Sequence, residues 1–309
     1  MASLSSRVEE ANKLLESGHK FMKTGLLKWS PDYDNAANQY QQAAQAYKGA
    51  GVHQKAIEAN ECAIKAYLAT QHSAFQAAKC MEQAALSSKE LNDYQAVSKY
   101  YMRAIDLYRT LGQVDTAVAV MDRAAKALAN NMPTLAADLY IQASEASVIE
   151  DRYRQAAEYC NKAATLYIKA KEYKRAANIA REEINCYAQA NDTRTCNRTA
   201  IGVILIHLAD NDIVAARNAL DRCQMDDDVF YLAQNLVTGF DKKDAKILNS
   251  TLNNPFFRQL DTEYAKIARE ILNEHGKLPP EGSQTANNPT TDSGEPADNI
   301  PDVDENALL

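Results

Sequence analysis

The sequence feature that most constrains the fold is an internal repeat of about 20 residues. An alanine recurs at intervals of 19 to 21 residues, and a second alanine follows seven or eight positions later in each unit up to residue 163. The first set is Ala36, Ala56, Ala77, Ala96, Ala117, Ala136, Ala156 and Ala176, and the second is Ala43, Ala63, Ala84, Ala104, Ala124, Ala143 and Ala163. Such a repeat is typical of an array of stacked units rather than of one central core.

Each unit has the pattern of an amphipathic helix. In the stretch 36–47 the apolar residues lie at offsets 0, 4, 7, 8 and 11, which form one stripe at 3.6 residues per turn. A strand would need alternation with a period of two. Connections of about two to four residues favour antiparallel neighbours. We therefore predict an all-α fold: a TPR-like, right-handed superhelical array of antiparallel helix pairs, about 14 helices in total, with a C-terminal helical bundle.

The pair length distinguishes this array from ordinary tetratricopeptide repeats, because two units occupy about 40 residues rather than about 34. Glycine, asparagine, aspartate and proline residues mark the breaks between helices. The expected helices are 6–24, 34–50, 53–70, 73–91, 93–111, 114–130, 133–150, 153–171 and 174–190.

Beyond residue 190 the repeat becomes irregular. We expect a buried helix at 200–209, further helices at 212–223, 229–239 and 241–252, and a last helix from Pro255 to about Glu274. The predicted regions are a TPR-like array (1–190), a C-terminal helical bundle (191–276) and a disordered acidic tail (277–309).

The distribution of charge argues against nucleic acid as a partner. The net charge is -7, and residues 277–309 carry seven acids against Lys277. About -1 therefore remains for the folded part, which leaves no strong positive field for a phosphate backbone. The N-terminus has no apolar signal core, and no aliphatic run reaches the ~20 residues of a membrane span. We expect a cytoplasmic protein.

No catalytic or metal-binding pattern is present. The six cysteines have no C-x-x-C pairing, and no histidine has a second histidine or a cysteine three or four residues away. Phosphate-loop, dinucleotide and H-E-x-x-H motifs are absent. We predict no catalytic residue, no metal site and no cofactor, and hence a protein that is not an enzyme. The cysteines are expected to be small buried hydrophobic residues in a reducing compartment.

Two stretches resemble a known family. The segment 24–40 reads TGLLKWSPDYDNAANQY, and the segment 102–108 reads MRAIDLY. The first resembles the N-terminal signature of the soluble NSF attachment protein (SNAP) family, specifically its gamma type, and the second resembles a stretch shared with the alpha type. The resemblance covers roughly residues 6–275. It implies a cytosolic, peripherally membrane-associated adaptor that binds SNARE complexes and recruits and stimulates the NSF-type AAA ATPase. That ATPase disassembles SNARE bundles in vesicle trafficking and membrane fusion.

The resemblance implies that the 26–29 connection contacts the membrane. Leu26, Leu27 and Trp29 would insert into the bilayer, and Lys28 would lie near anionic head groups. The alternative is that Trp29 folds back over the first helix pair.

A second surface implied by the resemblance is a basic stretch for an acidic SNARE bundle. Its residues are Lys162, Lys169, Lys171, Lys174, Arg175 and Arg181, with Glu172 the single acid among them. Lys162 matches a SNARE-contacting lysine of the alpha type, whereas Glu158 and Ala119 stand at two other such positions. The alternative is an ordinary solvated helix face.

The third surface is the acidic C-terminal end, which would contact the ATPase. Asp241 matches an acidic contact of the family, although its neighbouring matches are Thr238 and Lys242. The terminal residues that resemble the ATPase-stimulating end are Asp302, Asp304, Glu305 and Leu308. The alternative is a disordered tail that only adds solubility.

Two other classes of function remain open at this stage. One is a generic TPR-type interaction scaffold unrelated to SNAREs, and the other is a helical-repeat subunit of a transferase. The sequence does not name the SNARE set, the organelle or the number of copies per complex.

Overall fold

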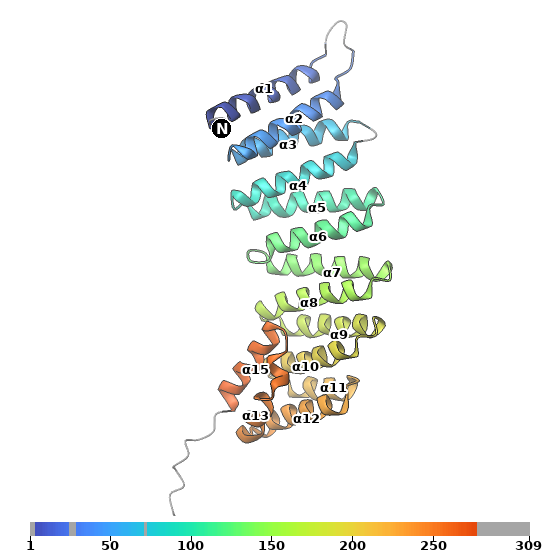
Figure 1. Cartoon of the computed structure of the whole chain (residues 1–309), viewed down its shortest axis with the longest axis vertical. Coiled ribbons are helices and arrows are strands. Elements are labelled where there is room, and N and C mark those ends of the chain that lie inside the picture. Colours follow the sequence, from blue (N-terminus) through green and yellow to red (C-terminus); the bar gives the residue numbers. More distant parts are fainter. Residues whose placement is uncertain (1–3, 25–28, 71–72, 277–309) are drawn as a thin grey trace, which may run out of the picture. The chain divides into compact units, whose positions relative to one another are not determined.

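The computed structural model describes residues 4–24, 29–70 and 73–276, and every regular element within them is an α-helix (Figure 1). These ranges contain fifteen helices: α1 (Leu4–Met22), α2 (Tyr33–Gly49), α3 (His53–Leu68), α4 (Ala74–Glu90), α5 (Tyr94–Thr110), α6 (Val114–Leu128), α7 (Pro133–Ile149), α8 (Tyr153–Lys169), α9 (Tyr173–Gln189), α10 (Thr193–Ala209), α11 (Ile213–Arg222), α12 (Asp227–Lys242), α13 (Ala245–Leu252), α14 (Pro255–Arg258) and α15 (Thr262–His275). The predicted all-α class is confirmed. The predicted tail, 277–309, lies outside the described residues.

The first ten helices form the predicted array of antiparallel neighbours. Each packs mainly against the helix before it and the helix after it, and Figure 1 shows them following one another in sequence order. From α1 to α9 the observed ends differ from the expected ones by at most two residues. The alanine repeat together with the residues that mark the breaks was therefore sufficient to place α2 to α9.

The connections between helices repeat one backbone motif, seen clearly between α4 and α5. Asn92 adopts the left-handed conformation, with φ 58°, and its N–H donates to the Lys89 carbonyl at 2.9 Å. The N–H of Asp93 donates to the Ser88 carbonyl at 3.0 Å. This is the Schellman pattern that ends a helix. Asp93 also begins the next helix, because its carboxylate accepts a hydrogen bond from the Ala96 N–H at 3.0 Å. Left-handed residues recur at the equivalent positions Gly51, Gly112, Asp151, Lys171, Asn191 and Asn211.

The repeat continues past residue 190, one unit further than predicted. The expected buried helix at 200–209 is the second half of α10, which begins at Thr193. Another left-handed turn follows at Asn211, and the Asp212 carboxylate caps α11 by accepting from the Ala215 N–H at 2.8 Å. The sequence carried this signal, because the Asn-Asp pair at 92–93 recurs at 191–192 and 211–212. The predicted division at residue 190 stays a prediction, and Met1–Lys277 cluster as one compact unit.

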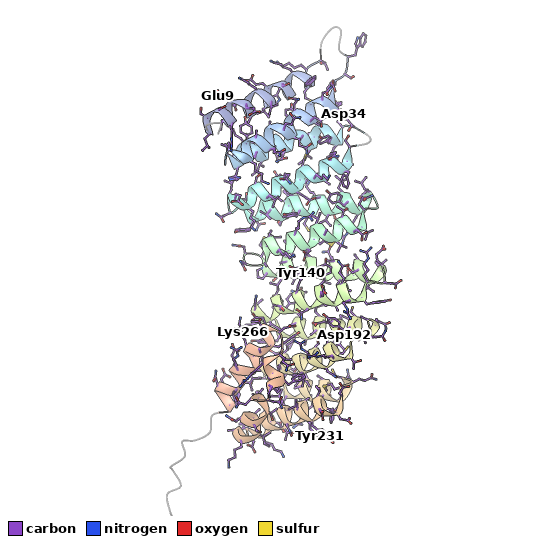
Figure 2. All side chains as sticks on the ribbon, in the orientation of Figure 1. Glu9, Asp34, Tyr140, Asp192, Tyr231 and Lys266 are labelled. Atoms are coloured by element: carbon purple, nitrogen blue, oxygen red, sulfur yellow. The ribbon has the colours of Figure 1, made fainter. Side chains whose placement is uncertain are left out.

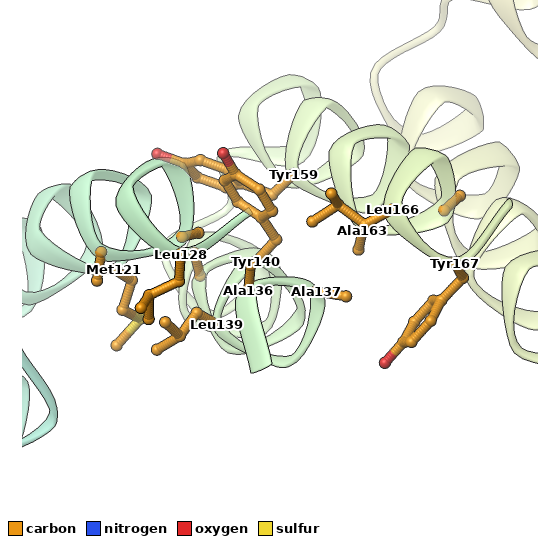
Figure 3. Packing of buried hydrophobic residues seen from close by; sticks show 14 of the residues in the cluster. Met121, Leu128, Ala136, Ala137, Leu139, Tyr140, Tyr159, Ala163, Leu166 and Tyr167 are labelled. Carbon is orange, nitrogen blue, oxygen red and sulfur yellow. The ribbon is translucent and has the colours of Figure 1, made fainter. Parts of the chain in front are cut away.

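Small residues bring the helices of the array close together. The second alanine of every unit is fully buried, and so are the first alanines except Ala96, whose neighbour Val97 takes the buried position. Figure 3 shows the arrangement between α7 and α8, where Ala136, Ala137 and Tyr140 face Tyr159 and Ala163. Alanine offers no side-chain entropy to lose and allows close backbone approach. Larger side chains then fill the spaces between neighbouring pairs.

Tyrosines carry much of this filling, and their hydroxyl groups reach polar partners. Tyr108 is fully buried, and its hydroxyl donates to Glu82 at 2.9 Å. Tyr167 occupies a related position in α8 and donates to Asp138 at 2.8 Å. Burial followed by these carboxylates raises the pKa of both tyrosines. The array thus buries its aromatic rings without leaving these hydroxyls unpaired.

The C-terminal part departs from the prediction of one last helix at 255–274. The helix that starts at Pro255 ends at Arg258, and α15 begins only at Thr262. Between them Leu260 is buried, and Asp261 is extended with ψ 152°. The Asp261 carboxylate accepts a hydrogen bond from Asn161 of α8 at 2.7 Å. This hydrogen bond joins the break to α8. The break raises the helix number from about 14 to fifteen in the described residues.

Candidate interaction surfaces

The connection between α1 and α2 is pinned at its base. The N–H of Asp32 donates to the Phe21 carbonyl at 3.1 Å, so the two ends of the connection lie side by side. Asp32 also caps α2 through the Asn35 N–H at 3.2 Å. Leu26, Leu27 and Lys28 lie outside the described residues.

Trp29 is the described residue of this predicted membrane-contacting segment, and its exposure is 93%. The alternative in which Trp29 folds back over the first helix pair is therefore wrong. A tryptophan this exposed is unusual in a folded domain, because burial of the ring would be favourable by a few kcal/mol. The side chain is available to a partner or to a membrane interface.

Three members of the predicted basic stretch are ion-paired within the chain. Lys162 pairs with Asp122 of α6 at 2.9 Å and lies over the rings of Tyr140 and Tyr159. Lys169 approaches Glu263 of α15 at 3.9 Å.

Arg175 pairs with Asp138 and Glu172, each at 3.0 Å, and stacks on the Tyr167 ring. Neighbouring helices thus supply acids that the local sequence does not reveal. The partial neutralisation leaves a smaller positive surface than the stretch suggests.

The other three cations are exposed and have no ion pair among the described residues. Lys171 and Lys174 lie at the turn between α8 and α9, next to Lys169 and Arg175. Arg181 lies further along α9, where it lines a cavity with Cys196 and residues 222–224, whereas Lys162 lines a different cavity. The structure therefore brings the four cations at 169–175 together and separates Lys162 and Arg181 from each other.

The two positions that depart from the alpha-type pattern differ in their surroundings. Glu158 is exposed on α8 and lines the same cavity as Lys162. Ala119 is half-buried on α6. Neither Glu158 nor Ala119 adds positive charge to the surface.

At the acidic end, Asp241 lies near the end of α12 and pairs with Arg217 of α11 at 2.5 Å. This ion pair links α11 to α12, so the Asp241 carboxylate is already bound to a cation within the chain. The other predicted residues, Asp302, Asp304, Glu305 and Leu308, lie outside the described residues.

Sequence reasoning missed one feature, the junction where α15 meets α8, α9 and α10. Glu183 of α9 is 1% exposed there, and its Oε1 atom accepts from Thr199 at 3.0 Å and from Asn161 at 3.2 Å. Burial raises the pKa of the Glu183 carboxyl to about 8, against these hydrogen bonds, which favour the carboxylate. Figure 2 shows the side chains of this region, with Lys266 on α15 and Asp192 before α10 labelled. The adjacent acid Glu182 is exposed, so the sequence alone does not distinguish the buried Glu183 from a solvated residue.

Within the described ranges there is no group of three or more histidine, cysteine, aspartate or glutamate residues that could hold a metal ion. The six cysteines, all described, are free thiols; four are buried and two half-buried. Among the described helices, none is long and apolar enough to cross a membrane.

Comparison with protein-family models shows which family the chain belongs to. The family model described as soluble NSF attachment protein, SNAP, matches residues 4–254. The chain belongs to this family. A gamma-soluble NSF attachment protein of Dictyostelium discoideum is 27% identical over 290 residues, covering 91% of this chain and 88% of that protein. One of Arabidopsis thaliana is 26% identical over 267 residues, covering 85% and 91%.

Solved structures with a similar arrangement are more distant. BtubC (BKLC) from P. vanneervenii has a TM-score of 0.39 at 15% identity, covering 76% of this chain and 93% of that one. A circular tandem repeat protein has a TM-score of 0.29 at 11% identity, covering 88% and 69%.

The SNAP family match spans α1 to α13. Trp29, the basic stretch and Asp241 all fall within it. Helix α15, which forms one side of the Glu183 junction, lies beyond its end.

Proposed function

We propose that this protein is a non-enzymatic adaptor that binds SNARE complexes and recruits and stimulates the NSF-type AAA ATPase. It would act in the cytoplasm, peripherally associated with membranes, in SNARE disassembly during vesicle trafficking and membrane fusion. The observation that carries the proposal is the SNAP family match over residues 4–254, together with relatives named gamma-soluble NSF attachment protein. Membership of this family argues against a generic TPR-type scaffold unrelated to SNAREs.

The direct experiment is co-sedimentation of the purified protein with immobilised, assembled SNARE complex, followed by addition of the ATPase in its ATP-bound state. The proposal predicts retention of the protein by the SNARE complex and then retention of the ATPase only when the protein is present. If the SNARE complex does not retain the protein, or the ATPase is retained equally without it, the proposal is wrong.

The exposed Trp29 supports a peripheral membrane contact at the α1–α2 connection. The test is flotation with anionic vesicles, comparing Trp29→Ser with Ile149→Ser, which alters an apolar side chain of 80% exposure at the end of α7. We expect the first change to reduce vesicle binding about tenfold, because an indole ring favours the interface, and the second to leave it unchanged. Equal effects of the two changes would refute the contact at Trp29.

The cluster of cations at 169–175 supports docking of an acidic SNARE surface. Lys171 and Lys174 are the appropriate residues to change, because neither belongs to an ion pair among the described residues. Their double reversal to glutamate should weaken SNARE binding and its salt dependence. A Lys89→Glu, Lys99→Glu variant makes the same change of charge on α4 and α5. If the two variants bind SNARE complexes equally well, the cluster is not the docking surface.

We propose that the acidic C-terminal end stimulates the ATPase, because its sequence resembles the ATPase-stimulating end of the SNAP family. Removal of residues 301–309 should abolish stimulation and spare SNARE binding. Full stimulation by the shortened protein would exclude this role. Asp241→Asn should have the smaller effect, since its carboxylate already pairs with Arg217.

A further inference from the structure

Two adjoining cavities lie where α9 and α11 both pack against α10. The smaller has a volume of about 170 Å³, and the larger has a volume of about 720 Å³. They share Arg181 of α9, Arg222 at the end of α11, and Cys223. Figure 1 shows the three helices in succession. We call the two cavities together the α9–α11 groove.

The two arginines that the cavities share are available to a ligand. Both residues are exposed, and neither forms an ion pair with a described residue. Arg181 donates from Nε to the Ala177 carbonyl at 3.3 Å and from Nη2 to the side-chain oxygen of Asn178. A guanidinium has five N–H donors, so these two bonds orient the group and leave further donors for an acceptor. Arg222 has no side-chain hydrogen bond to a described residue.

The charge on the groove wall favours an anion. The smaller cavity is lined by both arginines and by no acid. The larger cavity adds one acid, Glu182, which is exposed and accepts a hydrogen bond from Asn185 at 3.3 Å. Asp221 is next to Arg222 in the sequence but lines neither cavity. An anion in the smaller cavity therefore meets two positive charges and no negative charge on its walls.

The positive field of Arg181 reaches α10 and α11 across the smaller cavity. Burial, and then Arg181, lower the pKa of His207, whereas two nearby carboxylates, Asp212 and Asp210, oppose this change. Burial raises the pKa of the Cys223 thiol, and Arg181 acts in the opposite direction. Because its pKa lies below the ordinary value of 6.5, His207 is mostly neutral at about pH 7. It can supply a ring N–H donor rather than a third charge.

Two guanidinium groups on one cavity match a dianion. A phosphate monoester carries a charge of about -1.5 to -2 at pH 7 and has three acceptor oxygens, whereas a carboxylate carries a single charge. Arginine forks bind phosphate through paired, charge-assisted hydrogen bonds. Water occupies about 30 Å³ in the liquid, so the smaller cavity of about 170 Å³ has room for the five heavy atoms of a phosphate group.

The larger cavity suits a ligand with several hydroxyl groups. Most of its polar lining is uncharged and provides both hydrogen-bond donors and acceptors. These residues are Asn178, Asn185, Asn191, Thr193 and Gln224. A sugar or cyclitol ring attached to the phosphate can bond to such groups.

We propose that the α9–α11 groove binds the phosphate monoester of a polyol, either free or as a lipid head group. Arg181 and Arg222 bind the phosphate in the smaller cavity, and the polyol lies in the larger one. The proposal rests on the groove alone and does not depend on SNARE binding. It gives Arg181 a role separate from that of the four cations at 169–175.

The test uses myo-inositol 1-phosphate as the probe and myo-inositol, which lacks the phosphate, as the control. Binding is followed by chemical-shift changes of the Asn218 and Cys223 amide groups in the full-length protein. The probe should bind with a Kd of about 0.1–5 mM, as expected for a small ligand held by two charge-assisted contacts, and myo-inositol should not bind. No saturable binding of the probe, or equal binding of myo-inositol, would overturn the proposal.

Glutamine variants then locate the phosphate. Arg181→Gln and Arg222→Gln should each weaken binding of the probe at least about tenfold, because charge-assisted hydrogen bonds are lost. Both positions are exposed, so we expect both variants to fold. Arg194→Gln removes an exposed arginine of α10 that lines neither cavity and should change the Kd less than about twofold. If either groove variant binds as tightly as the original protein, the two-arginine assignment is wrong.

Vesicle flotation distinguishes the two sources of the ligand. Vesicles with phosphatidylinositol 4-phosphate are compared with vesicles of equal charge that contain phosphatidylserine, which has no phosphate monoester. A preference for the former that is lost in Arg181→Gln and Arg222→Gln supports a lipid head group. Binding of the soluble probe without this preference supports a free phosphorylated polyol. A phosphoserine peptide that binds at least about ten times more tightly than the probe would overturn the proposal, because the partner would then be a protein.

Discussion

The array and the α15 junction bury polar groups in opposite ways. In the array, Tyr108 and Glu82 form a complete local network, because the Glu82 carboxylate accepts from the tyrosine hydroxyl and also pairs with Arg123 at 2.6 Å. At the junction, Glu183 has no ion pair with any described residue, and one of its oxygens has no hydrogen-bond partner among them. Both sites place a glutamate beside a buried tyrosine, but only Glu82 has a cationic partner, Arg123, whereas burial raises the pKa of the Glu183 carboxyl to about 8.

The comparison indicates different roles for the two regions. Satisfied groups and alanine packing make the array a stable support that holds surfaces at fixed spacing. The junction retains an unfavourable buried carboxyl, which is a feature more often found at sites of function than in structural cores. Four sets of substitutions test this difference, from the largest expected effect to the smallest.

Removal of an array tyrosine should have the largest effect. Tyr108→Ala deletes a fully buried ring and should lower the free energy of unfolding by about 3–5 kcal/mol, measured by urea denaturation. Tyr108→Phe keeps the ring and loses only the hydrogen bond to Glu82, so its cost should be about 1 kcal/mol. Similar costs for the two variants would show that packing does not dominate in the array.

Neutralising Glu183 should increase stability. The folded-state pKa of about 8 lies above the ordinary value of 4.5. Protonation therefore favours the folded state, and this contribution is fully present below about pH 4.5 and lost as the pH rises to about 8. Glu183→Gln keeps the shape and cannot ionise in the unfolded state, so its advantage over the original protein should grow to about 3 kcal/mol at about pH 7.

The pH profile supplies the control for this prediction. The difference between Glu183→Gln and the original protein should be near zero at about pH 4.5 and should rise steadily above it. Glu182→Gln, at an exposed position, should show no such trend. A constant difference for Glu183→Gln across this range would mean that burial does not raise the pKa of the Glu183 carboxyl.

A methyl group at Gly202 should loosen the junction. A Cβ atom there would lie 2.9 Å from Cζ of Tyr264, so the buried ring of α15 would have to move away from α10. We expect Gly202→Ala to destabilise the protein by about 1–3 kcal/mol. At Gly49, by contrast, a Cβ atom meets nothing within 4 Å, and Gly49→Ala should be neutral or slightly stabilising in thermal unfolding. A neutral Gly202→Ala would mean that α15 is not tightly packed on α10.

Helix caps in the array should have the smallest effect. Asp93→Ala removes the side-chain acceptor of the Ala96 N–H and should cost about 1 kcal/mol. Gln113 begins α6 without a side-chain cap, so Gln113→Ala should have almost no effect in the same denaturation experiment. Equal costs would mean that the turn backbone, rather than the aspartate, fixes the start of the helix.

The array was predictable because its information is local. Alanines at a period of 20 residues, helical spacing of apolar residues and Asn-Asp or glycine turns each specify a helix or its end. These signals mark the ends of α1 to α9 within two residues, and the Asn-Asp pair at 211–212 is the same signal beyond residue 190.

The surfaces were less predictable because their chemistry depends on contacts distant in sequence. The basic stretch looked almost free of acids, but Asp122, Asp138 and Glu263 reach it from α6, α7 and α15. Likewise nothing near Glu183 in the sequence indicates that α15 covers it. The helix break at 259–261 lies at the same junction, where Asn161 of α8 donates a hydrogen bond to Asp261.

The most direct test of the contrast between array and junction is the pKa of the Glu183 carboxyl itself. Titration of the carboxyl carbons by NMR, with Glu183→Gln identifying the resonance, should give a pKa of about 8 in the free protein. A pKa near the ordinary value of 4.5 would contradict the account.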